Sequence, residues 1–384
     1  MHLPARWMTN TGTDCHCAVI TRFTMSNRPI CDTDTPDPWV VAANGKFYLT
    51  FTLGNRIEIW QSPHLEDFHN CQRTVVWHPP PGSPWSEDIW APELHYLNGV
   101  WYIYTCAAPP GVGNPGHRTV LLRSSKPDPM DSSGWAFLGP LKGMPDHWSI
   151  DATVFTITDE IELYCCWSGW PLGDHSDTQQ DLFLIKMASP EEAVADTLVC
   201  ISKADQPWER PDEGRRGVNE GPTWVNIQGF KGIVYSAHGS WTSEYKLALL
   251  ALVGEDPLRP ESWVKRQEPL MVSDRDQGGP FGPGHASFLP NPHNKGRVFC
   301  IYHGTEKCGE GWNNRKARVL DLGPECFAQH ALPVCCAYQA TCPGVGHSGV
   351  RRKHGETMDK MVESSPARVR GQLQGFLGKA KKFF

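Results

Sequence analysis

The 384-residue chain lacks any apolar run long enough to span a membrane, and its formal net charge of −6 is not that of a nucleic-acid-binding protein. Its first 27 residues lack the continuous apolar core of a signal peptide, because charged and polar residues such as Arg6, Asp14 and Arg22 interrupt them. We therefore expect no transmembrane segment, no nucleic-acid partner and a cytoplasmic location. Secretion is the alternative if the natural chain begins at a different residue.

The chain also lacks a recognisable pattern of metal-binding or disulfide-forming cysteines. Fourteen cysteines are present, but Cys165 and Cys166 are adjacent within a strand-like run, and Cys15-His16-Cys17 matches no standard zinc spacing. Without a signal sequence, reduced thiols are the expected state. Sixteen tryptophans are present instead, and we expect most of them to fill the core, with a few offering flat faces to a ligand.

A repeated pattern runs through most of the chain. Five times, an ionisable residue is followed at once by an apolar run that is interrupted by a turn, as in Asp37-Pro38 before the run that turns at Asn44-Gly45. The five ionisable residues are spaced 56, 58, 69 and 65 residues apart: Asp37, Glu93, Asp151, Glu220 and His285. Four-stranded units at such a period predict an all-β, single-domain, five-bladed β-propeller. The innermost strand of each blade would begin at one of these residues, so that all five side chains face the central axis.

These motifs resemble those of glycoside hydrolase family 43, over about residues 32–322. The resemblance rests on the following segments: Thr35-Pro36-Asp37-Pro38-Trp39-Val40, Trp90-Ala91-Pro92-Glu93-Leu94, Ser149-Ile150-Asp151-Ala152-Thr153, Asn219-Glu220-Gly221-Pro222 and Gly282-Pro283-Gly284-His285. The resemblance implies a five-bladed propeller enzyme that acts on arabinofuranosyl or xylosyl residues.

The residues themselves indicate an acid pair with a third, tuning carboxylate. Glycoside hydrolysis needs one acid to protonate the leaving oxygen and one carboxylate to activate water, and crowding raises the pKa of one of them. The resemblance assigns the roles. Asp37 resembles the general base, Glu220 the general acid, and Asp151 the residue that orients the acid and tunes its pKa. It implies inversion at the anomeric carbon, with base and acid about 6.5–9.5 Å apart.

Other residues are candidates for secondary roles. Glu93 and Trp90 are expected on the substrate side, with a purely structural role as the alternative for Glu93. Trp170 and Arg315 are further candidates for substrate binding, with Arg318 as the alternative to Arg315. The resemblance implies that His285 holds a water-coordinated structural cation, often calcium. A neutral histidine that is hydrogen-bonded inside the channel is the alternative. The chemistry itself requires no cofactor.

The ends of the chain fall outside the repeat. We expect residues 1–31 to be a disordered extension, 32–325 the propeller, and 326–384 a divergent, disordered tail. The last apolar residues have helical spacing among Arg and Lys side chains, which is compatible with a basic amphipathic helix, although three glycines weaken it.

The predicted function is removal of terminal α-L-arabinofuranosyl residues from arabinose-containing glycans or oligosaccharides, by a monomer. A β-xylosidase of the same family is the first alternative. A sugar-binding propeller without activity is the second, and retention of all three acids argues against it. A retaining, fructan-type propeller hydrolase is a third, but the Arg-Asp-Pro tripeptide of those enzymes is absent from this sequence.

Overall fold

The structure, a computed structural model, describes residues 28–157 and 162–328. Over these ranges the chain is all-β: it forms twenty strands and seven short 3-10 helices, and no α-helix. The all-β prediction is therefore confirmed. None of the helices in the described ranges could cross a membrane. The predicted C-terminal amphipathic helix lies outside the described residues.

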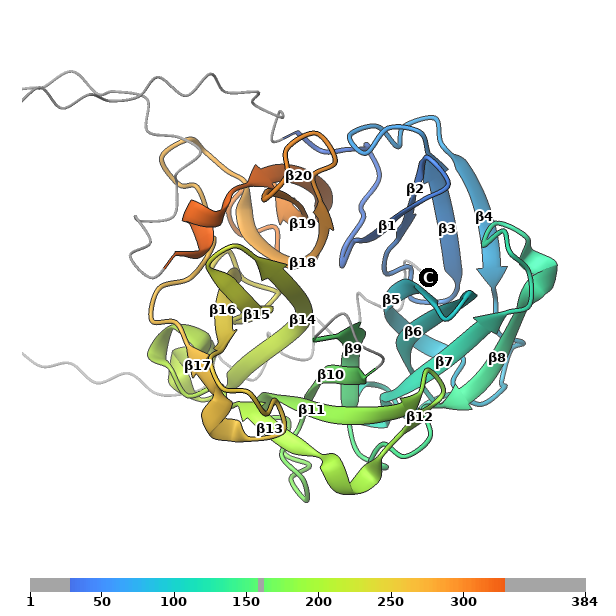
Figure 1. Ribbon diagram of the computed structural model, residues 1–384, viewed down its shortest axis with the longest axis horizontal. Coiled ribbons are helices and arrows are strands. Elements are labelled where there is room, and N and C mark those ends of the chain that lie inside the picture. Colours follow the sequence, from blue (N-terminus) through green and yellow to red (C-terminus); the bar gives the residue numbers. More distant parts are fainter. Residues whose placement is uncertain (1–27, 158–161, 329–384) are drawn as a thin grey trace, which may run out of the picture. The chain divides into compact units, whose positions relative to one another are not determined.

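Four hydrogen-bonded sheets contain these strands (Figure 1). The first sheet consists of β1 (Trp39–Ala43), β2 (Lys46–Thr50), β3 (Ile57–Ser62) and β4 (Gln72–Trp77). The second consists of β5 (Glu87–Leu97), β6 (Val100–Ala108), β7 (Arg118–Ser124) and β8 (Trp135–Pro140). The three-stranded sheet consists of β18 (Phe281–Pro290), β19 (Val298–Thr305) and β20 (Lys316–Leu322).

The nine-stranded sheet is two antiparallel groups joined by a short parallel pairing. Gln179 pairs with Gly217, and Gln180 with Val218. The first group consists of β9 (Ser149–Thr156), β10 (Leu163–Gly169), β11 (Gln179–Ser189), β12 (Glu192–Ala193) and β13 (Val199–Ser202). The second consists of β14 (Gly217–Ile227), β15 (Phe230–Ala237), β16 (Lys246–Leu252) and β17 (Trp263–Lys265).

Two of the predicted Asn-Gly turns form tight hairpins. Asn44 and Gly45 link β1 to β2, and Asn98 and Gly99 link β5 to β6. All four residues have positive φ, between 52° and 82°. This conformation matches the twist of paired strands, and asparagine and glycine adopt it at the lowest cost. These turns fix the register of the strands that begin at the candidate site.

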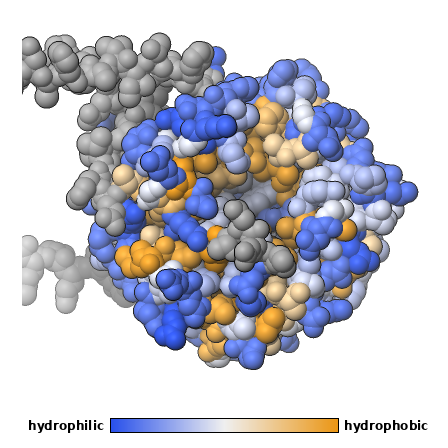
Figure 2. All heavy atoms as spheres, viewed as in Figure 1, coloured by the Kyte–Doolittle hydropathy of each residue, from blue (hydrophilic) through white to orange (hydrophobic). Residues whose placement is uncertain are grey.

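Five strands lie nearest the centre in Figure 1: β1, β5, β9, β14 and β18. Each contacts the next one in this order, and β18 contacts β1. Figure 2 shows that hydrophilic residues dominate the outer edge of the face in view. The five inner strands therefore lie side by side in one circuit.

The N-terminal segment of the described chain lies along the last sheet. Ile30 N–H donates to Ala317 O over 2.9 Å, and Thr35 N–H donates to Arg315 O over 2.8 Å. Ile30 is 1% exposed and shares a buried cluster with residues of β2 and β19, including Leu49 and Ile301. The expected extension, residues 1–31, therefore includes two residues, Ile30 and Cys31, that are buried in the fold.

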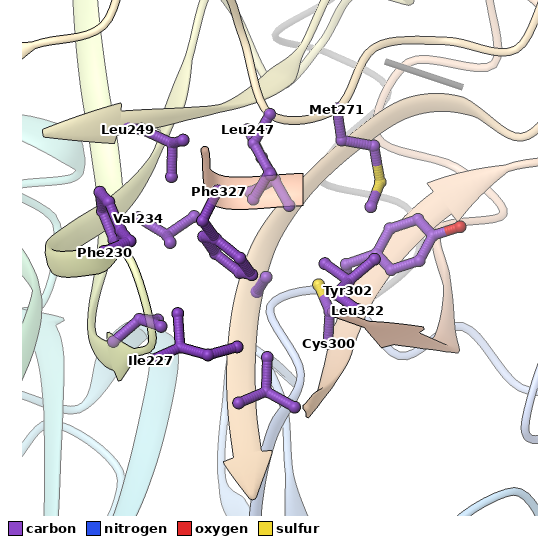
Figure 3. Packing of buried hydrophobic residues seen from close by; sticks show 14 of the residues in the cluster. Ile227, Phe230, Val234, Leu247, Leu249, Met271, Cys300, Tyr302, Leu322 and Phe327 are labelled. Atoms are coloured by element: carbon purple, nitrogen blue, oxygen red, sulfur yellow. The ribbon is translucent and has the colours of Figure 1, made fainter. Parts of the chain in front are cut away.

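The predicted boundary between the propeller and the C-terminal tail, at residues 325 and 326, lies inside the packed fold. After β20, the 3-10 helix η7 (Pro324–Phe327) returns to the core between β15 and β18. Figure 3 shows Phe327 among Phe230, Val234 and Leu247. Phe327 is 0% exposed. The predicted tail thus begins too early at residue 326, since Phe327 completes a buried cluster.

We predict that ending the chain after Ala328 leaves its melting temperature nearly unchanged. Residues 329–384 have no strand periodicity, and termini of that composition carry few contacts. Ending the chain after Leu322 removes Phe327 and costs about 3–5 kcal/mol of stability, as loss of a buried phenylalanine does. Calorimetry of both truncated proteins checks this, with Val253→Ala, at a 62% exposed side chain, as the control. Equal melting temperatures for the two truncations would contradict it.

Candidate active site

A β-bulge at the start of the inner strands positions the candidate groups. In four inner strands, β5, β9, β14 and β18, the pairing register shifts at a residue with positive φ. Asp37 has the same conformation just before β1. The left-handed residues nearest the candidate groups are Asp37, Ala91, Asp151, Gly221 and His285, and β5 and β18 each contain a second one, Asp88 and Gly282. Bulges re-aim a side chain, and they are common beside active sites. This repeated backbone feature turns Asp37, Asp151 and His285 towards one another.

The register also corrects the predicted equivalence of the five residues. Glu220 lies one residue before its left-handed position, which is Gly221. Glu93 lies two residues after Ala91. Their side chains therefore leave the strand differently from those of Asp37 and Asp151. The spacing of the sequence repeat could not reveal this, because a shift of one residue reverses the face that a side chain occupies.

Asp37 is surrounded by groups that stabilise its charge. The Thr52 hydroxyl donates to Oδ2 over 2.7 Å, and Arg315 Nη1 lies 3.5 Å from Oδ1. The Asp37 N–H donates to His303 Nδ1 over 3.0 Å, so this nitrogen carries no proton. Burial alone would raise the pKa of Asp37, but Arg315, the two nearby histidines and Thr52 together hold it well below its usual range. Asp37 is therefore ionised at neutral pH.

His285 bridges two of the three acids. Its Nδ1 lies 3.3 Å from Asp37 Oδ1 and 4.0 Å from Asp151 Oδ2, and its backbone N–H donates to Ser236 Oγ over 2.7 Å. Burial lowers the pKa of His285, although Asp37 opposes this shift. Because Asp37 and Asp151 both approach one imidazole nitrogen, their carboxylates are close neighbours.

Asp151 and Glu220 are two buried carboxyls linked through the backbone of Gly221. The N–H of Gly221, next to Glu220, donates to Asp151 Oδ2 over 2.9 Å. Burial and the neighbouring charges of Glu220 and Asp37 raise the pKa of Asp151 well above its usual range. Burial also raises the pKa of Glu220, against the hydrogen bonds from Tyr245 and Gln180. Two buried carboxyls so placed retain a proton to higher pH than either would alone.

A polar chain leads outward from Glu220. Gln180 Nε2 donates to Glu220 Oε2 over 3.0 Å, and Arg216 Nη2 lies 3.4 Å from Gln180 Oε1. Arg216 also donates to Asp177 over 2.6 Å. The side chain of Gln180 is buried, so its amide has a fixed orientation. This chain places Glu220 firmly and brings a positive charge near it.

Glu93 forms a hydrogen bond with a buried histidine. Its Oε2 is 2.8 Å from His95 Nε2, and both side chains are buried. Burial raises the pKa of Glu93 well above its usual range and lowers that of His95 to about 3. The contact is therefore a neutral hydrogen bond and not an ion pair. This arrangement favours the structural role for Glu93 over the substrate-side role.

The tryptophan candidates lie at the same end of the molecule as the acids. Gly169 at the end of β10 pairs with Ser149 at the start of β9, so Trp170 follows directly at the mouth. Trp170 is 2% exposed and stacks on Trp148 with ring centres 4.8 Å apart. Trp90 is half-buried and packs on His117 at 3.9 Å. Trp170 is thus a buried wall and not an exposed stacking surface, and substrate binding by Trp90 stays a prediction.

The described surroundings of His285 give no evidence for the calcium ion that the resemblance implies. Its Nδ1 faces Asp37 and Asp151, and residues 28–157 and 162–328 contain no group of three or more His, Cys, Asp or Glu side chains placed to hold one. The geometry agrees with the neutral histidine in the channel. No step of the chemistry is assigned to a cation.

Several residues at the site escape sequence reasoning. Thr52 and His303 support Asp37, whereas Gln180 and Tyr245 support Glu220. Thr52, Gln180 and His303 belong to or follow apolar strand runs, where the alternating pattern reports only the strand. Tyr245 adjoins β16 and is buried against Gly284, at which a Cβ would lie 2.0 Å from the tyrosine ring. Gly284, directly before His285, is the sequence signal for Tyr245, because a glycine leaves room for a large neighbouring side chain.

Fold and site together define a class: an all-β protein with three clustered carboxyls at the mouth of its inner strands. Residues 26–330 match the family model of glycosyl hydrolases family 43. The chain belongs to this family, and the resemblance inferred from its motifs is confirmed.

Among its relatives is alpha-L-arabinofuranosidase B of Pyricularia oryzae, which is 30% identical over 70% of this chain and 54% of that protein. Alpha-L-arabinofuranosidase 43 of Humicola insolens is 30% identical over 74% of this chain and 59% of its own length. The chain thus spans little more than half the length of these two relatives. The crystal structure of an alpha-L-arabinofuranosidase from Lactobacillus brevis is 29% identical, with a TM-score of 0.66 over 75% of this chain and 90% of that one.

The predicted cytoplasmic location is wrong. Two relatives, from Streptomyces avermitilis and Streptomyces chartreusis, are named extracellular exo-alpha-(1->5)-L-arabinofuranosidases and are 29% and 30% identical to this chain. The prediction rested on the composition of residues 1–27, which lie outside the described residues. All nine cysteines in the described ranges are free thiols, but this does not determine the compartment.

Gly221 offers a test of the bulge that holds the acids. Its φ is +53°, and an added Cβ would lie 3.0 Å from His285 Cγ. We predict that Gly221→Ala costs more stability than Gly229→Ala, because Gly229 also has positive φ (+83°) but has no neighbour within 4 Å of its Cβ position. The left-handed conformation alone costs roughly 1–2 kcal/mol. Urea unfolding of both variants measures the difference, and equal losses would show that His285 can move aside.

Proposed function

We propose that this chain is an inverting glycosidase that removes terminal α-L-arabinofuranosyl residues from arabinose-containing glycans or oligosaccharides. Family membership and relatives named as arabinofuranosidases support this proposal. The observation that carries it is the opposite environment of the acids: Asp37 is held ionised, whereas Asp151 and Glu220 are biased towards keeping a proton.

The proposal includes the architecture and the setting. We infer that the sheets are five blades of a closed propeller, since five inner strands contact one another in a ring. We infer that the protein acts outside the cell, as two of its relatives are named to do. We also propose that the protein acts as a monomer. The chemistry uses side chains and water only.

Asp37 is the proposed general base. A base must be ionised before it can take a proton from water, and the contacts with Arg315 and Thr52 keep Asp37 in that form. Arg315 is proposed to touch a substrate hydroxyl as well. In the inverting reaction the water attacks the anomeric carbon from the face opposite the leaving group while Asp37 removes its proton.

Glu220 is the proposed general acid. It gives its proton to the glycosidic oxygen as the bond to the anomeric carbon breaks, and it must therefore still be protonated near neutral pH. Asp151 is proposed to orient Glu220 through Gly221 and to raise its pKa. The relatives near 30% identity favour the arabinofuranosidase over the β-xylosidase alternative. The supported carboxyls favour an enzyme over an inactive sugar-binding protein.

Substrates with different leaving groups separate the two main roles. We predict that Glu220→Ala lowers kcat/KM on arabino-oligosaccharides by about 10²–10⁴-fold but spares much of the activity on a dinitrophenyl arabinofuranoside, whose leaving group departs without a proton. Asp37→Ala should depress both activities alike, because every substrate needs the water. If Glu220→Ala lost equal activity on both while Asp37→Ala spared the activated one, the roles would be reversed. If both variants stayed active, the site would lie elsewhere.

The pH dependence tests the role of Asp151. The alkaline limb of kcat/KM reports the loss of the proton from the acid. Asp151→Asn removes a neighbouring carboxyl from the coupled pair, so Glu220 loses its proton at lower pH and the alkaline limb should move to lower pH. Asp146→Asn, at an exposed acid that pairs with Arg118, is the matched control and should leave the limb in place. An unchanged limb in Asp151→Asn would remove the tuning role.

A further inference from the structure

Two loops beside the candidate site carry an unexplained pair of tryptophans. Ala237 at the end of β15 pairs with Asn219 at the start of β14, so residues 238–245 form a loop at the mouth beside Glu220. Thr305 at the end of β19 pairs with Phe281 at the start of β18. Residues 306–315 therefore form a second loop at the same end.

Each loop contributes one ring. The centres of Trp241 and Trp312 lie 6.1 Å apart, with the ring planes at 74°. Trp241 is half-buried, but Trp312 is 62% exposed. A ring of this size left in water exposes apolar area that most proteins bury. Because Trp312 contributes to no described core cluster, packing does not explain its presence.

Hydrogen bonds between the loops hold the rings in place. Trp312 Nε1 donates to Ser240 Oγ over 3.1 Å, and Gly309 N–H donates to Ser243 Oγ over 2.8 Å. Arg275 adds an ion pair to Glu244. A surface whose side chains are already ordered loses less conformational entropy when a ligand binds to it.

The pair is connected to the proposed acid. The Arg216 guanidinium lies 5.1 Å from the centre of the Trp241 ring, in the geometry of a cation–π contact. The same Arg216 contacts Gln180, which donates to Glu220. The acid protonates the oxygen that leaves, so the part of the substrate that leaves lies on the side of Glu220. The tryptophan pair lies on that side too.

We propose that Trp241 and Trp312 form a stacking site for a sugar unit on the leaving side of the bond that is cleaved. The occupant is an arabinofuranosyl ring of an arabino-oligosaccharide, whose C–H face packs on the exposed Trp312 ring. The site favours oligosaccharides over substrates with no second sugar. This inference rests on the proposed glycosidase function.

The test compares kcat/KM on α-1,5-arabinotriose with that on p-nitrophenyl α-L-arabinofuranoside, which has no second sugar. Trp312→Ala should lower the ratio of the two values about tenfold, with the loss mainly in KM of the trisaccharide, and Trp312→Phe should restore most of it. Val253→Ala is the control, because its side chain is equally exposed and follows β16 at the other end of that strand. It should leave the ratio unchanged.

The outcomes distinguish this inference from the function on which it rests. A wild-type protein that cleaves both substrates, with the same ratio in Trp312→Ala, would overturn the stacking site and leave the glycosidase proposal standing. A wild-type protein that cleaves neither would overturn both. A fall in the ratio for Trp312→Ala that Trp312→Phe does not reverse would assign the effect to loop distortion and would also overturn the stacking site.

Discussion

A left-handed residue at the mouth of each inner strand is the constraint on which the site depends. Such a residue forces an extra residue into the strand, and the resulting bulge turns one side chain out of the pleat. At Asp37, Asp151 and His285 the side chain that is turned carries a charge or a ring nitrogen. At Gly221 it is absent, which lets the backbone N–H reach Asp151. The same kind of bulge thus positions Asp151 and, at Gly221, the N–H that donates to it.

The pKa of each acid depends on the groups that surround its side chain. Asp37 meets a guanidinium, a hydroxyl and two imidazoles, whereas Asp151 meets another carboxyl and one N–H. Asp151 is buried and the side chain of Asp37 is only 13% exposed, so burial does not explain why one pKa falls and the other rises. The partners decide, since Arg315, the two histidines and Thr52 together outweigh the desolvation of Asp37, whereas Asp151 has no cation beside it among the described residues to do so. A base and an acid can therefore share one small site.

Much of this could be predicted from the sequence, because short-range signals carry it. Asn44-Gly45 fixes a hairpin, and an acid before proline at Asp37 marks a strand mouth, so the fold class and three acids were within reach. The contact of Glu93 with His95 could not be predicted, because a one-residue bulge changes the direction in which the Glu93 side chain leaves the strand. Partners distant in sequence, such as His303 with Asp37, were also hidden. Ile30 and Phe327 likewise gain their packing from strands far away in the chain.

The central claim is that a water activated by Asp37 attacks opposite a leaving group protonated by Glu220. The stereochemistry of the first product tests this most directly, since a single displacement must invert the anomeric carbon. Proton NMR of arabinose released early from an α-L-arabinofuranoside, before mutarotation, reads the configuration. The account predicts the β-anomer as the first product. The α-anomer appearing first would mean a covalent intermediate with one of the carboxylates, and it would contradict the assignment of Asp37 as a base.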